Sequence, residues 1–268
     1  SGMIYREFSP NGILSEFIDQ YWIVQNQIHS PGKYKILPDG YSDFIFCLSG
    51  VAMPKANENS LSLCEAYYVG AMTVFSELTA LPTRLDLLGI RFKPGGLSVF
   101  CDIPLHEFRN LRINNEESAF LFPPGFTDRL CELQTTGERI AEIENFLITR
   151  LSKHFIPDRQ VHFAVKQIHA SHGQVSMNNL MEKICLCQRH FERKFKHHTG
   201  YSPKEFARIA RFRHTTHLLQ STLPLNYQHL AMDCGYYDHS HMAKEFRQLS
   251  GASLTEFCDF PDKGPIEM

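Results

Sequence analysis

Two segments in the C-terminal third of the chain carry polar and charged side chains at helical spacing. The first set is Gln188, Arg189, Glu192, Arg193 and Lys196, and the second is His239, Ser240, His241, Lys244 and Arg247. Side chains of these types form the hydrogen bonds and ion pairs by which proteins contact base edges and phosphates of nucleic acid. Both sets are therefore candidate DNA-contacting residues.

Each polar set alternates with apolar side chains that lie four residues apart. Phe191 and Phe195 occur within the first set, and Met242 and Phe246 within the second. Residues four apart share one face of a helix, so these pairs are expected to face a core. The polar side chains would then occupy the outer faces of two amphipathic helices.

Cys185 and Cys187, with His190 just beyond them, are residues that could ligate a metal. A structural zinc site usually needs four ligands in two well-separated pairs, and this group offers neither the number nor the spacing. We therefore predict no metal here. The histidine pairs His197-His198 and His239-x-His241 are better interpreted as polar neighbours of DNA, whose phosphates would favour the protonated imidazole.

Asp39 and Asp43 are the nearest approach to a catalytic carboxylate pair, but their spacing around Gly40 is typical of a turn. The sequence has no nucleophile elbow, phosphate loop or dinucleotide fingerprint. The segment Lys93-Pro94-Gly95-Gly96 could cradle a phosphate, yet an ordinary hairpin turn explains it better. The chain is therefore not expected to be an enzyme, and we assign no cofactor-binding residue.

The elements that would position the two polar sets repeat along the chain. Leu180 corresponds to Leu230 at an offset of 50, and Phe195 corresponds to Phe246 at an offset of 51. Each unit consists of a short helix, a tight turn and a longer helix closed by glycine, which is the order of a helix-turn-helix. A plain helical domain with solvated faces is the alternative, and the repetition argues against it.

The preceding part of the chain shows a different pattern. Residues 1–125 consist of short apolar runs separated by Pro and Gly turns, which predicts a β barrel or sandwich. Residues 137–154 form an amphipathic helix, and Pro157 follows it. We predict an α+β chain: a mainly-β domain with flanking helices at 1–154, and an all-α domain with two helix-turn-helix units at 155–268.

The charge distribution agrees with this division. Residues 1–154 hold 13 Lys and Arg against 18 Asp and Glu, whereas residues 155–260 hold 13 against 9. A basic domain attached to an acidic one suits a nucleic-acid-binding module. No apolar run is long enough to span a membrane, and no export signal is evident, so we expect a cytoplasmic protein with reduced thiols.

Residues 174–260 resemble the DNA-binding domain of AraC/XylS-type bacterial transcription regulators. The motifs that carry the resemblance are Phe195-Lys196-His197-His198-Thr199-Gly200-Tyr201-Ser202-Pro203, Arg211-Phe212-Arg213, Cys234-Gly235-Tyr236 and Phe246-Arg247-Gln248-Leu249-Ser250-Gly251. The resemblance implies seven helices that present two recognition helices to successive major-groove faces. It places Arg189, Glu192 and Arg193, and then His239, Ser240, His241 and Lys244, at base-facing positions.

Two residues depart from that pattern. Cys185 stands where the first turn of the family usually has Gly, so the turn must avoid a positive φ or be strained. Leu254 stands where the family often has Pro. Neither departure alters the expected fold.

The N-terminal half resembles, through Leu37-Pro38-Asp39-Gly40 and residues 89–96, the β-rich domain of one subgroup of these regulators. The resemblance implies a sensor of an unknown small molecule or a dimerisation domain. The apolar stripe of residues 137–154 could cover its own β domain or a second copy of the chain. The expected function is therefore a small-molecule-controlled transcription regulator acting on operator DNA, with RNA polymerase as a further partner.

Two other functions stay open at this stage, a bifunctional enzyme fused to a DNA-binding module and a constitutive DNA binder without an effector. The sequence does not decide whether genes are activated or repressed.

Overall fold

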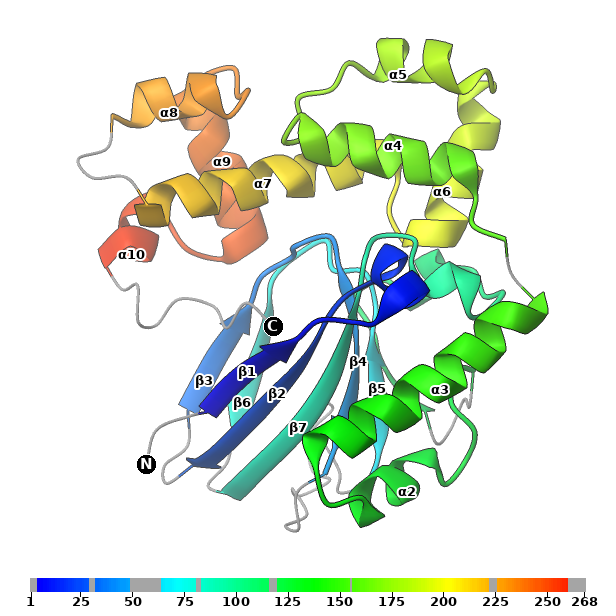
Figure 1. Cartoon of the computed structure of the whole chain (residues 1–268). Helices are drawn as coiled ribbons and strands as arrows, with labels where there is room; N and C mark the ends of the chain where they lie inside the picture. Colours follow the sequence, from blue (N-terminus) through cyan, green and yellow to red (C-terminus); the bar gives the residue numbers. More distant parts are fainter. Residues whose placement is uncertain are drawn as a thin grey trace.

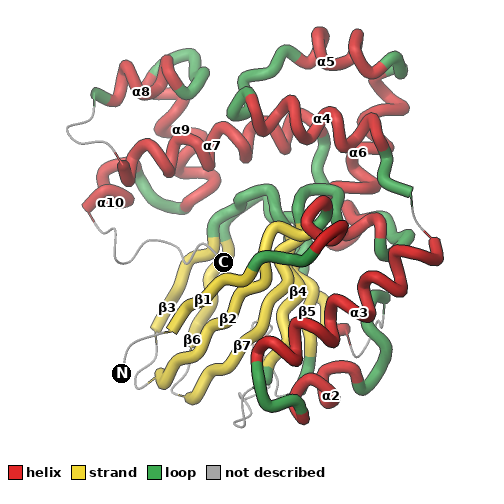
Figure 2. The backbone as a smooth tube through the Cα atoms, in the orientation of Figure 1, coloured by secondary structure: helices red, strands yellow, loops and turns green. Residues whose placement is uncertain are grey.

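The N-terminal half is built around an antiparallel β-sheet in the computed structural model of the chain (Figures 1 and 2). The structure describes residues 4–28, 32–48, 64–80, 83–115, 120–154, 156–221 and 226–259. The strands are β1 (Ile4–Phe8), β2 (Ile18–Ile28), β3 (Gly32–Ile36), β4 (Ser42–Cys47), β5 (Ala66–Val69), β6 (Ser76–Ala80), β7 (Thr83–Phe92) and β8 (Arg112–Asn114). Six of them pair in the order β1-β2-β7-β4-β5-β8, and β3 and β6 form a separate two-stranded sheet. The larger sheet ends in β1 and β8 among the described strands, so a sandwich, not a closed barrel, describes this domain.

Alternation along the strands buries both faces of the larger sheet. Tyr21 and Ile23 of β2 point into the main core of the domain, whereas Trp22 and Val24 point to the opposite face. Gly89 of β7 pairs with Trp22, and a Cβ there would lie 1.9 Å from the indole ring. Only glycine leaves room for that side chain, which explains the Gly within this apolar strand.

Helices α2 (Phe126–Glu132) and α3 (Thr136–His154) cover the main core (Figure 1). Ile143 and Leu147 of α3 are fully buried, and Phe146 packs against the same cluster. The apolar stripe that the sequence placed on this helix therefore covers its own β domain. A second copy of the chain is not needed to bury it.

The C-terminal half is helical throughout its described residues. Its helices are α4 (Arg159–Ala170), α5 (Met177–Ile184), α6 (Gln188–Thr199), α7 (Pro203–Ser221), α8 (Tyr227–Asp233), α9 (His239–Ser250) and α10 (Leu254–Asp259). They form two clusters, one from α4, α5, α6 and the first part of α7, and one from the rest of α7 with α8, α9 and α10. No described helix of the chain is long and apolar enough to cross a membrane.

Capping residues mark the helix boundaries. Asp158, Ser176, Asn226 and Asp238 each accept hydrogen bonds from backbone N–H groups in the first turn of the helix that follows. Such caps satisfy donors that the helix itself cannot. These four residues therefore set the starts of α4, α5, α8 and α9.

Candidate nucleic-acid interface

Helices α6 and α9 hold the two predicted sets of DNA-contacting residues. The buried pairs are as expected, because Phe191, Phe195, Met242 and Phe246 are all 0% exposed. Most of the outer positions are exposed, and Glu192 and Lys196 are partly exposed. The exposed residues are Gln188, Arg189, Arg193, His239, Ser240, His241, Lys244 and Arg247. Each helix therefore presents one continuous polar face to solvent.

The turn before α6 contains a strained residue. Cys185 ends α5 with φ 57° and ψ 35°, in the left-handed region that disfavours side chains. Gly235, in the corresponding turn of the second unit, has φ 76°. The first turn thus keeps the family geometry and places cysteine where glycine would be unstrained.

Within the first unit, Gln188 donates a hydrogen bond from Nε2 to Oε1 of Glu192, at 2.9 Å. This bond joins Glu192, a predicted base-facing position, to Gln188, another of the candidate DNA-contacting residues. Arg189 and Arg193 make no hydrogen bond or ion pair within the described part of the chain, so both guanidinium groups are available to a ligand. A free guanidinium can bond O6 and N7 of guanine with two parallel hydrogen bonds.

The second unit begins with a different arrangement. The side chain of Asp238 caps α9 by accepting from the N–H of His241, at 2.7 Å, and Nδ1 of His241 accepts from the N–H of Tyr237. The imidazole of His241 is therefore partly committed to the turn. The Tyr237 side chain is 89% exposed beside the start of α9. Tyr237 is not among the residues that the sequence pattern predicts to contact DNA, although an exposed aromatic residue before a recognition helix can reach the DNA backbone.

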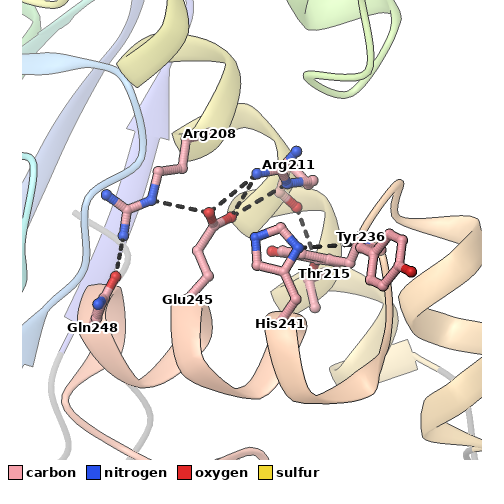
Figure 3. A network of polar contacts seen from close by, with 8 residues as sticks. Arg208, Arg211, Thr215, Tyr236, His241, Glu245 and Gln248 are labelled. Carbon is pink, nitrogen blue, oxygen red and sulfur yellow. Dashed lines mark hydrogen bonds and ion pairs between the residues drawn. The ribbon is translucent and has the colours of Figure 1, made fainter.

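Equivalent residues of the two recognition helices form ion pairs with the helix that precedes each helix-turn-helix unit. In the first unit, Nζ of Lys194 lies 2.8 Å from Oδ2 of Asp158, the cap of α4. Glu245, at the matching position of α9, is buried and bonds both Arg208 and Arg211 of α7, at 3.0 to 3.3 Å (Figure 3). The residue on the recognition helix is therefore a cation in the first unit and an anion in the second, but it occupies the same position of the helix.

The β domain contacts both units at the closing end of the recognition helix. Gly200, after α6, lies against Ala71, and Gly251, after α9, lies against the ring of Phe75. Nζ of Lys35 also donates to the carbonyl of Gly251, at 3.2 Å. The β domain therefore holds the C-terminal ends of α6 and α9, away from the exposed residues at their N-terminal ends.

Ion pairs and ring contacts add to this domain contact. Arg109 bonds Glu205 at the start of α7, with 2.6 Å between Nη1 and Oε1. The ring of Tyr41 lies between two guanidinium groups, Arg91 of β7 at 4.3 Å and Arg213 of α7 at 4.8 Å. Such cation–π contacts couple the β domain to the helix that joins the two units.

Asp39 and Asp43, the carboxylates weighed for catalysis, both lie near Arg91. Asp39 pairs directly with the Arg91 guanidinium. Oδ1 of Asp43 accepts from the indole N–H of Trp22, at 2.9 Å, and burial raises the pKa of Asp43 to about 6. These contacts give both carboxylates a structural role. Asp39 lies in a turn, where its Oδ1 accepts from the N–H of Tyr41 at 2.9 Å, whereas Asp43 lies within strand β4 and is not a turn residue.

A cavity of about 810 Å³ lies between the two domains, and the sequence did not reveal it. Residues from distant parts of the chain line it, namely Ser15–Phe17, Tyr41, Lys93–Gly96 and Ser98–Val99 of the β domain, and Pro157–Asp158, Val161–His162, Val165–Lys166, His169–Ala170 and His198. One wall, Lys93–Gly96, is the segment that the sequence pattern offered as a possible phosphate cradle. The other walls carry no motif and meet this segment only in the folded chain.

The charged groups of the cavity are of both signs, with Lys93 and Lys166 opposed by Glu16 and Asp158. Burial lowers the pKa of His162, the charge of Lys166 lowers it further, and the charge of Glu16 acts in the opposite direction. Nδ1 of His198 is buried without a hydrogen-bond partner among the described residues, and burial lowers the pKa of this imidazole. The carboxylate of Asp158 is paired with Lys194. The cavity therefore combines charged groups of both signs with an unsatisfied nitrogen of His198.

Known protein families match a part of each half of the chain. Residues 180–259 match the family described as "Helix-turn-helix domain", and residues 6–114 match a family described as "Domain of unknown function". No curated protein matches the sequence.

Several solved structures are similar to the chain. ToxT from Vibrio cholerae is 12% identical, with a TM-score of 0.47 over 89% of this chain and 98% of ToxT. A ToxT structure with a bound unsaturated fatty acid is 11% identical, with a TM-score of 0.43 over 89% and 94% of the two chains. The xylose-binding transcription activator XylR is 14% identical, with a TM-score of 0.34 over 46% of this chain and 38% of XylR.

The matched family covers both repeated units and both exposed polar helices. The resemblance found in the sequence is thereby confirmed: the C-terminal domain is an AraC-type double helix-turn-helix domain, and the chain is a DNA-binding transcription regulator with a β-rich domain at its N-terminus.

Proposed function

We propose that the chain reads operator DNA through α6 and α9 while the β domain adjusts how these two helices are held. The observation that carries the proposal is the position of the domain contact. Gly200 and Gly251 lie against the β domain, whereas the exposed polar residues of α6 and α9 face solvent. One rigid support thus contacts both recognition helices without covering the side that would meet DNA.

The base-reading roles can be tested by substituting arginines. Arg193→Ala or Arg189→Ala should weaken operator binding by about 1–3 kcal/mol, because a bidentate contact to guanine is lost. Arg6→Ala, an exposed arginine of β1 in the β domain, is the matched control and should leave affinity unchanged. Fluorescence anisotropy with operator and scrambled duplexes measures the DNA affinity of each variant. Equal affinity of the Arg193 variant and the Arg6 control would contradict the assignment.

The interdomain cavity is the proposed effector site. Its volume is within the roughly 300–1,000 Å³ typical of small-molecule sites, and its walls combine apolar and polar side chains. Because both domains contribute walls, an occupant would favour one arrangement of the domains over another. Binding could then be linked to DNA affinity through the contacts at Tyr41 and Arg213.

The two lysines of the cavity are the proposed partners of an anionic effector with an apolar part, because Asp158 is already paired with Lys194 and Glu16 is the one other carboxylate among the described residues that line the cavity. Lys93 and Lys166 supply positive charge from opposite domains, and His198 offers an unpaired nitrogen. Phe17, Val99 and Val161 supply the apolar surface, which an uncharged carbon skeleton would cover.

A thermal-shift panel of small carboxylates and phosphates on the full chain tests this site. An effector should raise the melting midpoint, and Lys166→Ala should abolish the shift while Lys204→Ala, an exposed lysine of α7 outside the cavity, should not. Shifts that persist in a Lys93→Ala, Lys166→Ala double variant would place the ligand elsewhere.

A second copy of the chain and RNA polymerase are further proposed partners. Because the apolar stripe of α3 is buried on its own β domain, a dimer would form through another surface.

A further inference from the structure

Two thiols far apart in the sequence lie against each other in the β domain. The Sγ atoms of Cys64 and Cys131 are 3.3 Å apart, and both side chains are half-buried. A disulfide bond has about 2.05 Å between its sulfurs, so roughly 1.3 Å of approach would be needed to form one. The described part of the chain has no other contact between two cysteine sulfurs.

Backbone hydrogen bonds fix the position of Cys64. Its N–H donates to the carbonyl of Cys47, and the N–H of Cys47 donates to the carbonyl of Glu65, each at 3.0 Å. These bonds extend the pairing of β4 with β5 by one step. Cys64 also has φ 56°, in the region that non-glycine residues rarely adopt. The chain therefore accepts a strained backbone where the thiol meets Cys131.

Helix α2 fixes the position of Cys131. Leu130 is fully buried in the core, and the guanidinium of Arg139 donates to the carbonyls of Leu130 and Leu133, at 3.0 and 2.9 Å. Burial, and then the hydrogen bond to Cys64, raises the pKa of Cys131 to about 12. Cys131 is therefore a protonated thiol within hydrogen-bond distance of the sulfur of Cys64.

We propose that Cys64 and Cys131 are a reversible disulfide pair that responds to a peroxide-class oxidant. Cys64 loses its proton, and the thiolate attacks one peroxide oxygen. The O–O bond breaks, leaving a sulfenic acid on Cys64 and a hydroxide that takes up the released proton. The sulfur of Cys131 then attacks Sγ of Cys64, the S–O bond breaks, and water leaves with the Cys131 proton. Two electrons pass from the sulfurs to the peroxide, which becomes two water molecules.

The cross-link would close a long loop that includes part of the β-domain side of the domain contact. Ala71, Phe75, Arg91, Lys93 and Arg109 all lie between the two cysteines. Closing a loop of this length restricts the unfolded chain, so the oxidised β domain should resist unfolding more strongly than the reduced one.

Peptide mapping of the full-length protein tests the pair. After brief treatment with hydrogen peroxide and alkylation, a cross-linked peptide should join Cys64 to Cys131, and dithiothreitol should remove it. The melting midpoint should rise by several degrees on oxidation. Cys131→Ala and Cys64→Ala should lose both the cross-link and the rise, whereas the control Cys258→Ala should keep both.

Cys185 and Cys187 are exposed and serve as internal comparisons for thiol reactivity. Oxidation confined to these two, with Cys64 and Cys131 still alkylated, would overturn the proposal. Sulfinic acid on Cys64 without a cross-link in the wild-type protein would also overturn it. Because the map is made on the wild-type chain, the decision does not depend on whether an alanine variant folds.

Discussion

Cys185 shows at the scale of one residue how a family geometry can be kept at a cost. The left-handed conformation disfavours a side chain by about 1–2 kcal/mol, whereas glycine adopts it freely. The thiol of Cys185 is exposed, so its loss removes little packing. The strain is therefore not offset by burial of the side chain.

We expect Cys185→Gly to raise the free energy of unfolding by up to about 1 kcal/mol, since relief of strain exceeds the greater flexibility of glycine in the unfolded chain. Urea unfolding monitored by circular dichroism measures the change. Cys187→Gly, two residues later and with φ −68°, is the control and should be neutral or destabilising. A loss of stability in the Cys185 variant would show that the turn is not strained.

At the scale of elements, the carboxylate of Glu245 connects α9 to α7. It is 7% exposed and is compensated by Arg208 and Arg211 (Figure 3). Removing one partner of a buried ion pair leaves the other charges uncompensated, which costs about 3–5 kcal/mol. Glu245→Ala should therefore lower the free energy of unfolding by that amount. Glu192→Ala, on the solvent face of α6, should change it by no more than about 0.5 kcal/mol. Equal effects on chemical unfolding would show that Glu245 is not an anchor.

The contact of α4 with the β domain should respond to pH through His169. Its ring stacks on Phe206, and burial, followed by the charge of Arg213, lowers its pKa to about 4. The unfolded chain binds the proton below about pH 6.5 and the folded chain only near pH 4, so stability should fall as the pH drops between these values.

Between pH 7 and pH 5, the free energy of unfolding should fall by about 1–2 kcal/mol less in His169→Gln than in the wild-type protein, with allowance for partial exposure of the ring. Urea unfolding at both pH values gives the comparison. His190→Gln, on the exposed face of α6, is the control, and its free energy of unfolding should depend on pH as strongly as that of the wild-type protein. An unchanged dependence in the His169 variant would assign the effect to other groups, such as His162 or His214, whose pKa burial also lowers.

Local sequence patterns predicted the helices and strands, but they did not predict contacts between distant parts of the chain. Phe191, Phe195, Met242 and Phe246 repeat at helical spacing, so the recognition helices and their buried faces followed from the sequence. The cavity did not, because Lys93 and His198 meet only when two domains pack together. The burial of the α3 stripe could not be decided either, since an apolar face fits its own domain or another copy equally well until the core is seen.

At the scale of the whole molecule, the DNA-binding half is proposed to be an independent unit, with its boundary at 154–155. Its two clusters are nearly complete in themselves, and among the described residues the β domain adds only Ala71 to one and Leu37 to the other. Residues 155–268 alone should therefore fold and bind DNA, with affinity that falls steeply between about 50 and 200 mM salt as counterions are released. Circular dichroism and anisotropy titrations measure this, and a folded fragment without DNA affinity at the lower salt would refute it.

Selection of operator sites from a randomised duplex pool by the full-length protein tests the central claim most directly. If α6 and α9 read successive major-groove faces, the enriched DNA should contain two motifs centred about 10 base pairs apart. Arg193→Ala should relax positions in one motif, and Lys244→Ala positions in the other. Enrichment of a single motif that both variants leave unchanged, or no enrichment at all, would contradict the account.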